Sequence, residues 1–92
     1  MKTIHKYKLN MSGNRFAVDM AVGAIILNVD VPDHDIMVWA EVDDQAPLET
    51  VYFDVVGTGH KLTPGVNREF VGTTIFKFTG LVFHVYLIKE DK

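Results

Sequence analysis

The chain of 92 residues contains no cysteine. It therefore has no disulfide framework, no thiolate nucleophile and no cysteine-ligated metal site. A domain this short buries roughly 60–65% of its unfolded surface, so its core is small. Because no covalent cross-link contributes, packing or self-association must supply the stability. We expect a single β domain over residues 1–92, with a homodimer as an open alternative.

Long apolar runs are also missing. Residues 1–9 are polar and basic, unlike the apolar centre of a secretory signal peptide. No apolar segment approaches the ~20 residues that a membrane-spanning helix needs. We therefore expect an intracellular protein in the cytoplasm, without a membrane partner.

No window of the sequence shows a sustained helical period of 3.6 residues. Apolar side chains alternate with a period of two, in segments rich in β-branched and aromatic residues. Residues 10–14 have turn chemistry, and only a short helical turn fits at 44–48 or 61–68. The pattern predicts an all-β fold, a small antiparallel β-sandwich or flattened barrel of six to eight strands. The expected strands are 3–9, 14–20, 24–31, 36–42, 50–56, 70–78 and 81–88.

The alternation also predicts which side chains share a face of the sheet, because successive residues of a strand point to opposite sides. Two segments give the clearest assignments. One face carries Ile25, Leu27, Val29 and Val31 in the first segment, and Ile36, Val38, Ala40 and Val42 in the second.

Lysine and arginine are absent from residues 16–60, whereas nine of the twelve acids lie there. Several of these acids form two groups at chain turns, separated by the expected strand 36–42. A seven-residue strand spans roughly 23 Å, so we expect the groups at opposite ends of the domain. A catalytic carboxylate pair would need a separation below roughly 10 Å. The groups are Asp30, Asp33 and Asp35, and Asp43, Asp44 and Glu49.

These six acids have two interpretations. Aspartate is an ordinary turn-forming residue, which explains its positions without any function. Alternatively, the acids form a partner-binding surface, as two patches or one stripe, that engages a basic groove of a nucleic-acid-handling protein. Direct nucleic-acid binding is not expected, because the basic residues are few and scattered.

A glycine-rich segment follows the expected strand 50–56 and is a candidate ligand loop. Its two glycines can expose backbone N–H groups to an anion, and a histidine and a lysine add charge. Neither the P-loop nor the dinucleotide-binding spacing is present. The alternative is a β-bulge or tight turn that needs a positive φ. The segment comprises Gly57, Thr58, Gly59, His60 and Lys61.

Groups suited to catalysis or metal binding are scarce. The sole serine, Ser12, lies in the expected turn and not in a nucleophile elbow. His34 stands between Asp33 and Asp35, but no recognised metal-ligand spacing is present. We expect no enzymatic activity, no cofactor and no bound metal.

Three aromatic residues, Trp39, Tyr52 and Tyr86, take outward positions in the alternating pattern together with Met37. We expect them to share one outer sheet face. Such a set is either a second layer of the core or an exposed interface for a partner or a second copy.

Nearly the whole chain resembles a family of small bacteriophage and prophage proteins of this length. The chain departs from the family in the loop 30–35 and in the longer tail 86–92. The resemblance implies a phage origin and a role inside the infected host cell, and it carries over no catalytic residue. It rests on residues 1–7, Gly23-Ala24, Ile26-Leu27, Val29, Trp39-Ala40, Val42-Asp43, Gly57-Thr58-Gly59-His60, Phe70-Val71-Gly72-Thr73 and Leu81-Val82-Phe83-His84-Val85.

Three functions follow as hypotheses. The first is a non-enzymatic inhibitor of a host protein that acts through the acidic surface. By analogy with other small phage proteins, its target would be a nucleic-acid-handling defence complex such as CRISPR machinery. The second is a sponge for a nucleotide signal, which uses the loop 57–61. The third is a minor structural or assembly protein of the virion.

Overall fold

The computed structural model describes residues 1–13 and 15–89. This part of the chain contains eight β-strands and no helix, and hence no helix long and apolar enough to cross a bilayer. The strands are β1 (Lys2–Lys8), β2 (Asn10–Ser12), β3 (Arg15–Ala21), β4 (Ile25–Asp30), β5 (Met37–Asp43), β6 (Leu48–Gly57), β7 (Arg68–Ile75) and β8 (Val82–Ile88).

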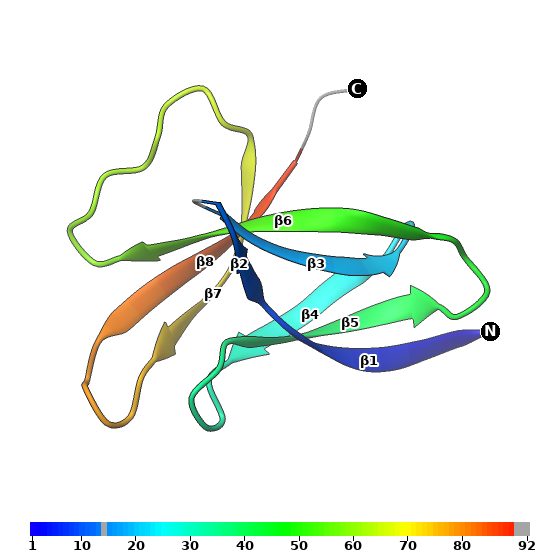
Figure 1. Ribbon diagram of the computed structural model, residues 1–92, viewed down its shortest axis with the longest axis horizontal. Helices are drawn as coiled ribbons and strands as arrows, with labels where there is room; N and C mark the ends of the chain where they lie inside the picture. The colour runs from blue at the N-terminus through cyan, green and yellow to red at the C-terminus, as the bar shows by residue number, and fades with distance from the viewer. Residues whose placement is uncertain (14, 90–92) are drawn as a thin grey trace.

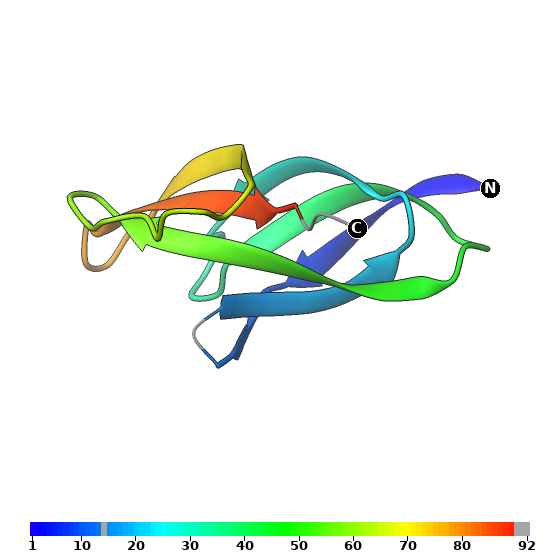
Figure 2. The same ribbon diagram turned by 90° about the horizontal axis from the view of Figure 1, so that it is seen from above.

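Two antiparallel sheets form the fold (Figures 1 and 2), which confirms the predicted all-β sandwich. The smaller sheet has the strand order β1-β5-β4, and the larger has β2-β3-β6-β8-β7. The chain passes between them at Leu9, whose N–H donates to the carbonyl of Ile36. At the other edge, β4 lies against β7, and Val29 closely approaches Gly72. These two links bring the edges of the two sheets together on both sides of the sandwich.

The core lies between the two sheets. Val38 and Ala40 of β5 are fully buried, as are Phe53 of β6 and Val85 of β8. Val42 is also buried, so the face predicted for 36–42 is confirmed. β-branched side chains fit this position because they pack well on a pleated, covered surface.

The face predicted for 24–31 is only half right. Val29 and Val31 are buried, but Ile25 and Leu27 are 53% and 50% exposed. A shift of register between Ile26 and Asn28 of β4 explains the difference. Such a bulge adds one residue to a strand, which turns the side chains on one side of it to the opposite face.

The short strand β2 was not predicted. It occupies part of the segment 10–14 that was predicted as a turn, and it pairs with the start of β3. Gly13 follows with a φ of 64°, and Asn14, included in the predicted strand 14–20, lies outside the described residues. Neither 44–48 nor 61–68 forms a helical turn.

Candidate functional site

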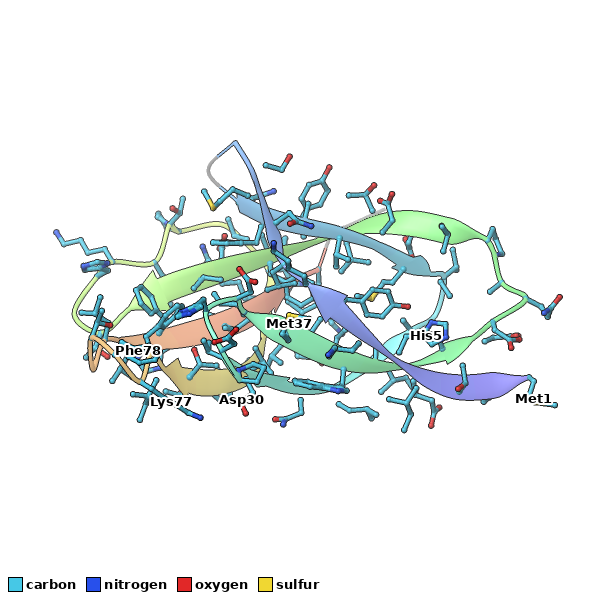
Figure 3. The ribbon with its side chains drawn as sticks, turned by 60° about the horizontal axis from the view of Figure 1, so that its bottom comes forward. Met1, His5, Asp30, Met37, Lys77 and Phe78 are labelled. Atoms are coloured by element: carbon cyan, nitrogen blue, oxygen red, sulfur yellow. The ribbon has the colours of Figure 1, made fainter. Side chains whose placement is uncertain are left out.

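The two groups of acids lie near opposite ends of β5. Asp30, Asp33 and Asp35 belong to the end of β4 and the loop that follows it. Asp43 is the last residue of β5, and Asp44 follows it in a turn. Figure 3 shows this separation, with Asp30 far from Met1, the residue beside the second group. The acids therefore form two patches, not one stripe.

The basic strand β1 runs antiparallel along β5 and brings positive charge to the acidic segment. Lys2 lies 3.7 Å from the carboxylate of Glu41, and Lys8 lies 3.8 Å from that of Asp35. The charges that are segregated along the sequence are thus interleaved in space. Because all four side chains are exposed to solvent, these pairs neutralise charge more than they stabilise the fold.

The second acidic group is partly neutralised within the chain. The amino group of Met1 lies 3.3 Å from a carboxylate oxygen of Asp43 and of Asp44. The hydrogen bond with Asp44, followed by that with Asp43, raises the pKa of the Met1 ammonium above 8.0. Hydrogen bonds from Gln45 are the main reason that the pKa of both carboxyls falls below 3.8.

Glu49 does not join Asp43 and Asp44. It lies on β6 opposite Met20 of β3, where it lines a cavity. Of the expected second group, Asp43 and Asp44 lie beside the amino group of Met1, whereas Glu49 lies at the border of this cavity.

The first acidic group meets a hairpin that is distant in sequence. The ring of His34 stacks on that of Phe78, with centroids 5.4 Å apart, and the His34 ring nitrogen lies 3.3 Å from Asp33. Phe78 is 81% exposed, at the turn between β7 and β8 (Figure 3). We call this surface the two-loop tip, which comprises Asp30, Asp33, His34, Asp35, Ile75, Phe78 and Leu81.

Sequence reasoning missed Phe78 because it was expected to end the strand 70–78. β7 instead ends at Ile75, and the N–H groups of Thr79 and Gly80 both donate to the carbonyl of Phe76. A signal was nevertheless present. A large apolar residue directly before Thr79-Gly80 lies in a turn, where no core covers it.

The glycine-rich segment forms a tight turn at the end of β6. Gly59 has a φ of 86°, and the N–H of His60 donates to the carbonyl of Gly57. The ring of His60 covers Gly57 so closely that a Cβ there would lie 3.0 Å from its Nδ1. The turn geometry accounts for both glycines without a ligand.

The same segment nevertheless borders a hollow of about 150 Å³ on the outer face of the larger sheet. Thr58 and His60 line it together with His84 and Tyr86 of β8. The two ring nitrogens of His84 are hydrogen-bonded to the hydroxyls of Thr58 (2.9 Å) and Thr73 (3.0 Å). The sequence predicted the glycine-rich wall of this hollow but did not place His84 of β8 beside it.

Lys61 borders an adjacent hollow of about 230 Å³ with Asp54 and Arg68. The Arg68 guanidinium is committed within the chain, because its Nε donates to Asp54 at 2.7 Å and its Nη1 donates to the carbonyl of Thr63 at 2.9 Å. Lys61 therefore supplies the positive charge available to a ligand here.

The three aromatic residues do not share a face, so that expectation is wrong. Trp39 belongs to β5 in the smaller sheet, whereas Tyr52 and Tyr86 belong to the larger one. Their neighbours Val38, Phe53 and Val85 point into the core, so Trp39 and the tyrosines point outward on opposite sides. Tyr86 packs edge-to-face on Phe70 instead.

No group of three or more histidine and acidic side chains suited to a metal ion occurs in residues 1–13 and 15–89. No curated protein and no solved structure matches the chain. A family described as a domain of unknown function, DUF7352, matches residues 1–92. The chain belongs to this family.

Proposed function

We propose that the protein is a non-enzymatic inhibitor that docks the two-loop tip into a groove of a host protein. The observation that carries this proposal is the exposed ring of Phe78, which stacks on His34 in the loop that also carries Asp33 and Asp35. An aromatic side chain with little cover is an effective anchor for a partner's pocket. Acids at its rim attract a basic partner and orient the encounter.

The two ends of the domain differ in a way that favours this tip. At the opposite end, the Met1 ammonium already pairs with both Asp43 and Asp44. At the tip, Asp35 pairs with Lys8. Asp30 accepts a hydrogen bond from the N–H of Val31, and Asp33 lies beside the ring of His34. Asp30 and Asp33 therefore have no lysine or ammonium partner among the described residues, which leaves both available to a basic protein.

The resemblance to phage proteins supports a host factor as the target, and the charge of the tip suggests its kind. Proteins that handle nucleic acid present grooves of lysine and arginine to phosphates. Carboxylates can occupy such a groove in place of phosphates, because they form similar charge-assisted hydrogen bonds. A host defence complex that binds nucleic acid, such as CRISPR machinery, is therefore the proposed target class.

The test is affinity capture from a phage-infected host, with mass spectrometry of the captured protein and an assay of its activity. Phe78→Ala and the double variant Asp33→Asn/Asp35→Asn should both abolish capture and inhibition. Asp43→Asn/Asp44→Asn is the matched control, because it removes the same charge at the other end and should leave both intact. Equal effects of the two double variants would reject the tip as the binding surface.

The hollow beside the glycine-rich turn favours a second candidate, a sponge for a nucleotide signal. Thr58, His60, His84 and Tyr86 provide hydrogen-bonding groups around it. Bound ligand should raise the melting temperature, and Thr58→Val should reduce that rise. Absence of any shift with a panel of cyclic and linear nucleotides would exclude this candidate. The virion-assembly alternative instead predicts a stable ring, which native mass spectrometry detects.

A further inference from the structure

The strand β1 forms an open edge of the smaller sheet. It pairs with β5 on one side, and its other side has no partner strand in residues 1–13 and 15–89 (Figure 1). At the opposite edge of this sheet, β4 lies against β7. The last described residue, Lys89, borders a cavity together with Ile26 of β4, so it lies near that opposite edge and not beside β1.

Hydrogen bonds at the two ends of β1 identify which backbone groups face the open side. The carbonyl of Met1 accepts from the N–H of Asp44, and the N–H of Leu9 donates to the carbonyl of Ile36. Both bonds join odd-numbered residues to the segment that contains β5, and direction alternates along an antiparallel strand. The N–H and C=O groups of the even-numbered residues therefore point away from β5. Among these residues are Lys2, Ile4 and Lys6.

β3 pairs with the chain only beyond the end of β1. Its ladder with β2 runs from the pair Ser12 and Arg15 to the pair Asn10 and Ala17, and it does not extend back along β1. From there β3 continues beside β6. An edge of this kind accepts an additional strand, because its N–H and C=O groups lack partners.

Thr3 and His5 supply a second, independent observation. They lie opposite Val42 and Ala40, whose side chains are buried in the core. Residues directly opposite each other in an antiparallel pair share a face, so Thr3 and His5 also point to the inner side. Both are nevertheless exposed to solvent. The described part of the chain thus leaves the sandwich uncovered along β1, and a further strand has access to this edge.

The charge of β1 indicates which kind of strand fits. Lys2 and Lys6 share the outer face with Glu41, and only Lys2 approaches its carboxylate, at 3.7 Å. Lys6 has no ion pair among the described residues. Pairing with β1 of a second copy brings lysines opposite one another, which is a common protection of edge strands against self-association. A strand with acidic side chains meets the same lysines with opposite charge.

We propose that the open edge of β1 binds an extended acidic segment of another protein, which adds to the smaller sheet as an antiparallel strand. Backbone hydrogen bonds with Lys2, Ile4 and Lys6 provide affinity, and carboxylates opposite the two lysines provide selectivity. The site does not rest on the proposed function, because these three residues lie outside the two-loop tip.

The register defines a probe peptide. Antiparallel addition places five successive peptide residues opposite Lys6, His5, Ile4, Thr3 and Lys2. The acetylated and amidated peptide Glu-Thr-Val-Thr-Glu puts a glutamate at each lysine and the valine at Ile4. In the free protein, the amides of Ile4 and Lys6 should exchange hydrogen faster than those of Thr3 and His5. Titration of the peptide into the full chain should give saturable NMR shifts of the Ile4 and Lys6 amides and slow their exchange.

Peptide variants separate strand addition from attraction between charges. N-methylation of the valine removes the donor that faces the carbonyl of Ile4, so it should abolish binding. N-methylation of the first threonine is the matched control, because its N–H points away from β1 and its loss should be tolerated. The peptide Lys-Thr-Val-Thr-Lys has the same pattern with the opposite charge and should not bind.

Protein variants test the selectivity for acids. Lys2→Gln/Lys6→Gln should weaken binding of the glutamate peptide roughly tenfold, since two exposed charge pairs are lost. Lys77→Gln is the control, because it removes an exposed lysine from the hairpin between β7 and β8 and should bind like the wild type.

Three results would overturn the proposal. The absence of shifts at Ile4 and Lys6, or equal binding of the two N-methylated peptides, would reject strand addition. Equal binding of the glutamate and lysine peptides would reject an acidic partner. A dimer in native mass spectrometry whose Ile4 and Lys6 amides are already protected from hydrogen exchange would assign the edge to a second copy.

Discussion

His34 and Phe78 stack with their ring planes 27° apart, although 44 residues separate them in the chain. The stack joins the loop after β4 to the hairpin between β7 and β8, and so joins the acids of one loop to the apolar tip of the other. Both rings remain largely exposed, so the contact positions the aromatic side chain more than it buries it. A rigidly held exposed ring binds with a smaller loss of conformational freedom than a mobile one.

Phe78→Ala should leave the fold intact while abolishing partner capture. Because Phe78 is 81% exposed, its removal should change the free energy of unfolding by less than about 0.5 kcal/mol. Met11→Ala on β2, at 62% exposure, is the control for loss of a surface apolar side chain and should affect neither property. Urea denaturation and affinity capture measure the two properties. A large loss of stability in Phe78→Ala would show that Phe78 is structural.

Gly72→Ala should destabilise the contact between the two sheets. A Cβ at Gly72 would lie 2.8 Å from Cγ1 of Val29, closer than carbon atoms approach each other. We expect a loss of about 1–3 kcal/mol in the free energy of unfolding, as for other overpacked cores. The same substitution in a Val29→Ala background should be much less harmful. Additive effects in this double-mutant cycle would contradict the steric explanation.

The period-two pattern predicted the fold because most strands alternate without interruption. Val38, Ala40 and Val42 are buried as predicted, and Phe53 confirms the inward face of β6. The prediction failed at Ile25 and Leu27, where a bulge turns the strand. A bulge depends on the pairing with β5, which no local pattern reveals.

The candidate site was less predictable, because its residues come together only through strand pairing. The acids of the loop 30–35 were predicted as a candidate site. Their separation from Asp43 was predicted from the length of the strand 36–42 between them. The pairing of β1 with β5 brings Lys8 to Asp35, and the adjoining hairpin brings Phe78 to His34. Both contacts connect distant segments, so neither could be predicted from local residue chemistry.

Thr74→Val should stabilise the protein. Thr74 is 2% exposed, and its hydroxyl has no hydrogen-bond partner in the described part of the chain. Valine has nearly the same shape without the unsatisfied polar group, whose burial is unfavourable. We expect a gain of about 1 kcal/mol, measured by urea denaturation. Thr73→Val is the contrast, because it removes the hydroxyl that is bonded to His84 and should bring no gain.

The cluster of Met1, Asp43 and Asp44 should stabilise the fold only within a window of pH. Because the pKa of the ammonium is raised in the folded protein, its contribution to stability is complete below pH 8.0. This contribution disappears as the pH rises through the pKa of the folded state. Because the pKa values of the two carboxyls are lowered in the folded protein, the contribution of the carboxylates to stability is complete above pH 3.8. It disappears as the pH falls through the pKa values of the folded state.

The melting temperatures of the wild type and of Asp43→Asn/Asp44→Asn should therefore differ most between pH 3.8 and pH 8.0. Below and above this range the two melting temperatures should converge. The difference should be small because all three groups are exposed, and salt should reduce it further. In the double variant, the pKa of the Met1 amine should return toward 8.0 in an NMR titration. An unchanged titration of Met1 would contradict the hydrogen bonds to these carboxylates.

Arg68→Met should loosen the long loop after β6 as well as destabilise the domain. The ion pair with Asp54 is partly buried, at 11% and 18% exposure, and Arg68 also binds the carbonyl of Thr63. Its removal leaves a poorly solvated carboxylate, so we expect a loss of about 1–3 kcal/mol. Amide exchange in residues 58–67 should accelerate, as measured by mass spectrometry.

Lys89→Met is the matched control for this pair. It breaks the exposed ion pair with Glu69, whose side chains are 49% and 56% exposed. Solvent screening makes such a pair worth less than about 1 kcal/mol, so the free energy of unfolding should hardly change. If the two variants lost equal stability, burial would not be the reason that Arg68 matters. If Arg68→Met alone were destabilising but the loop exchanged at its normal rate, the bond to Thr63 would have no part in holding the loop.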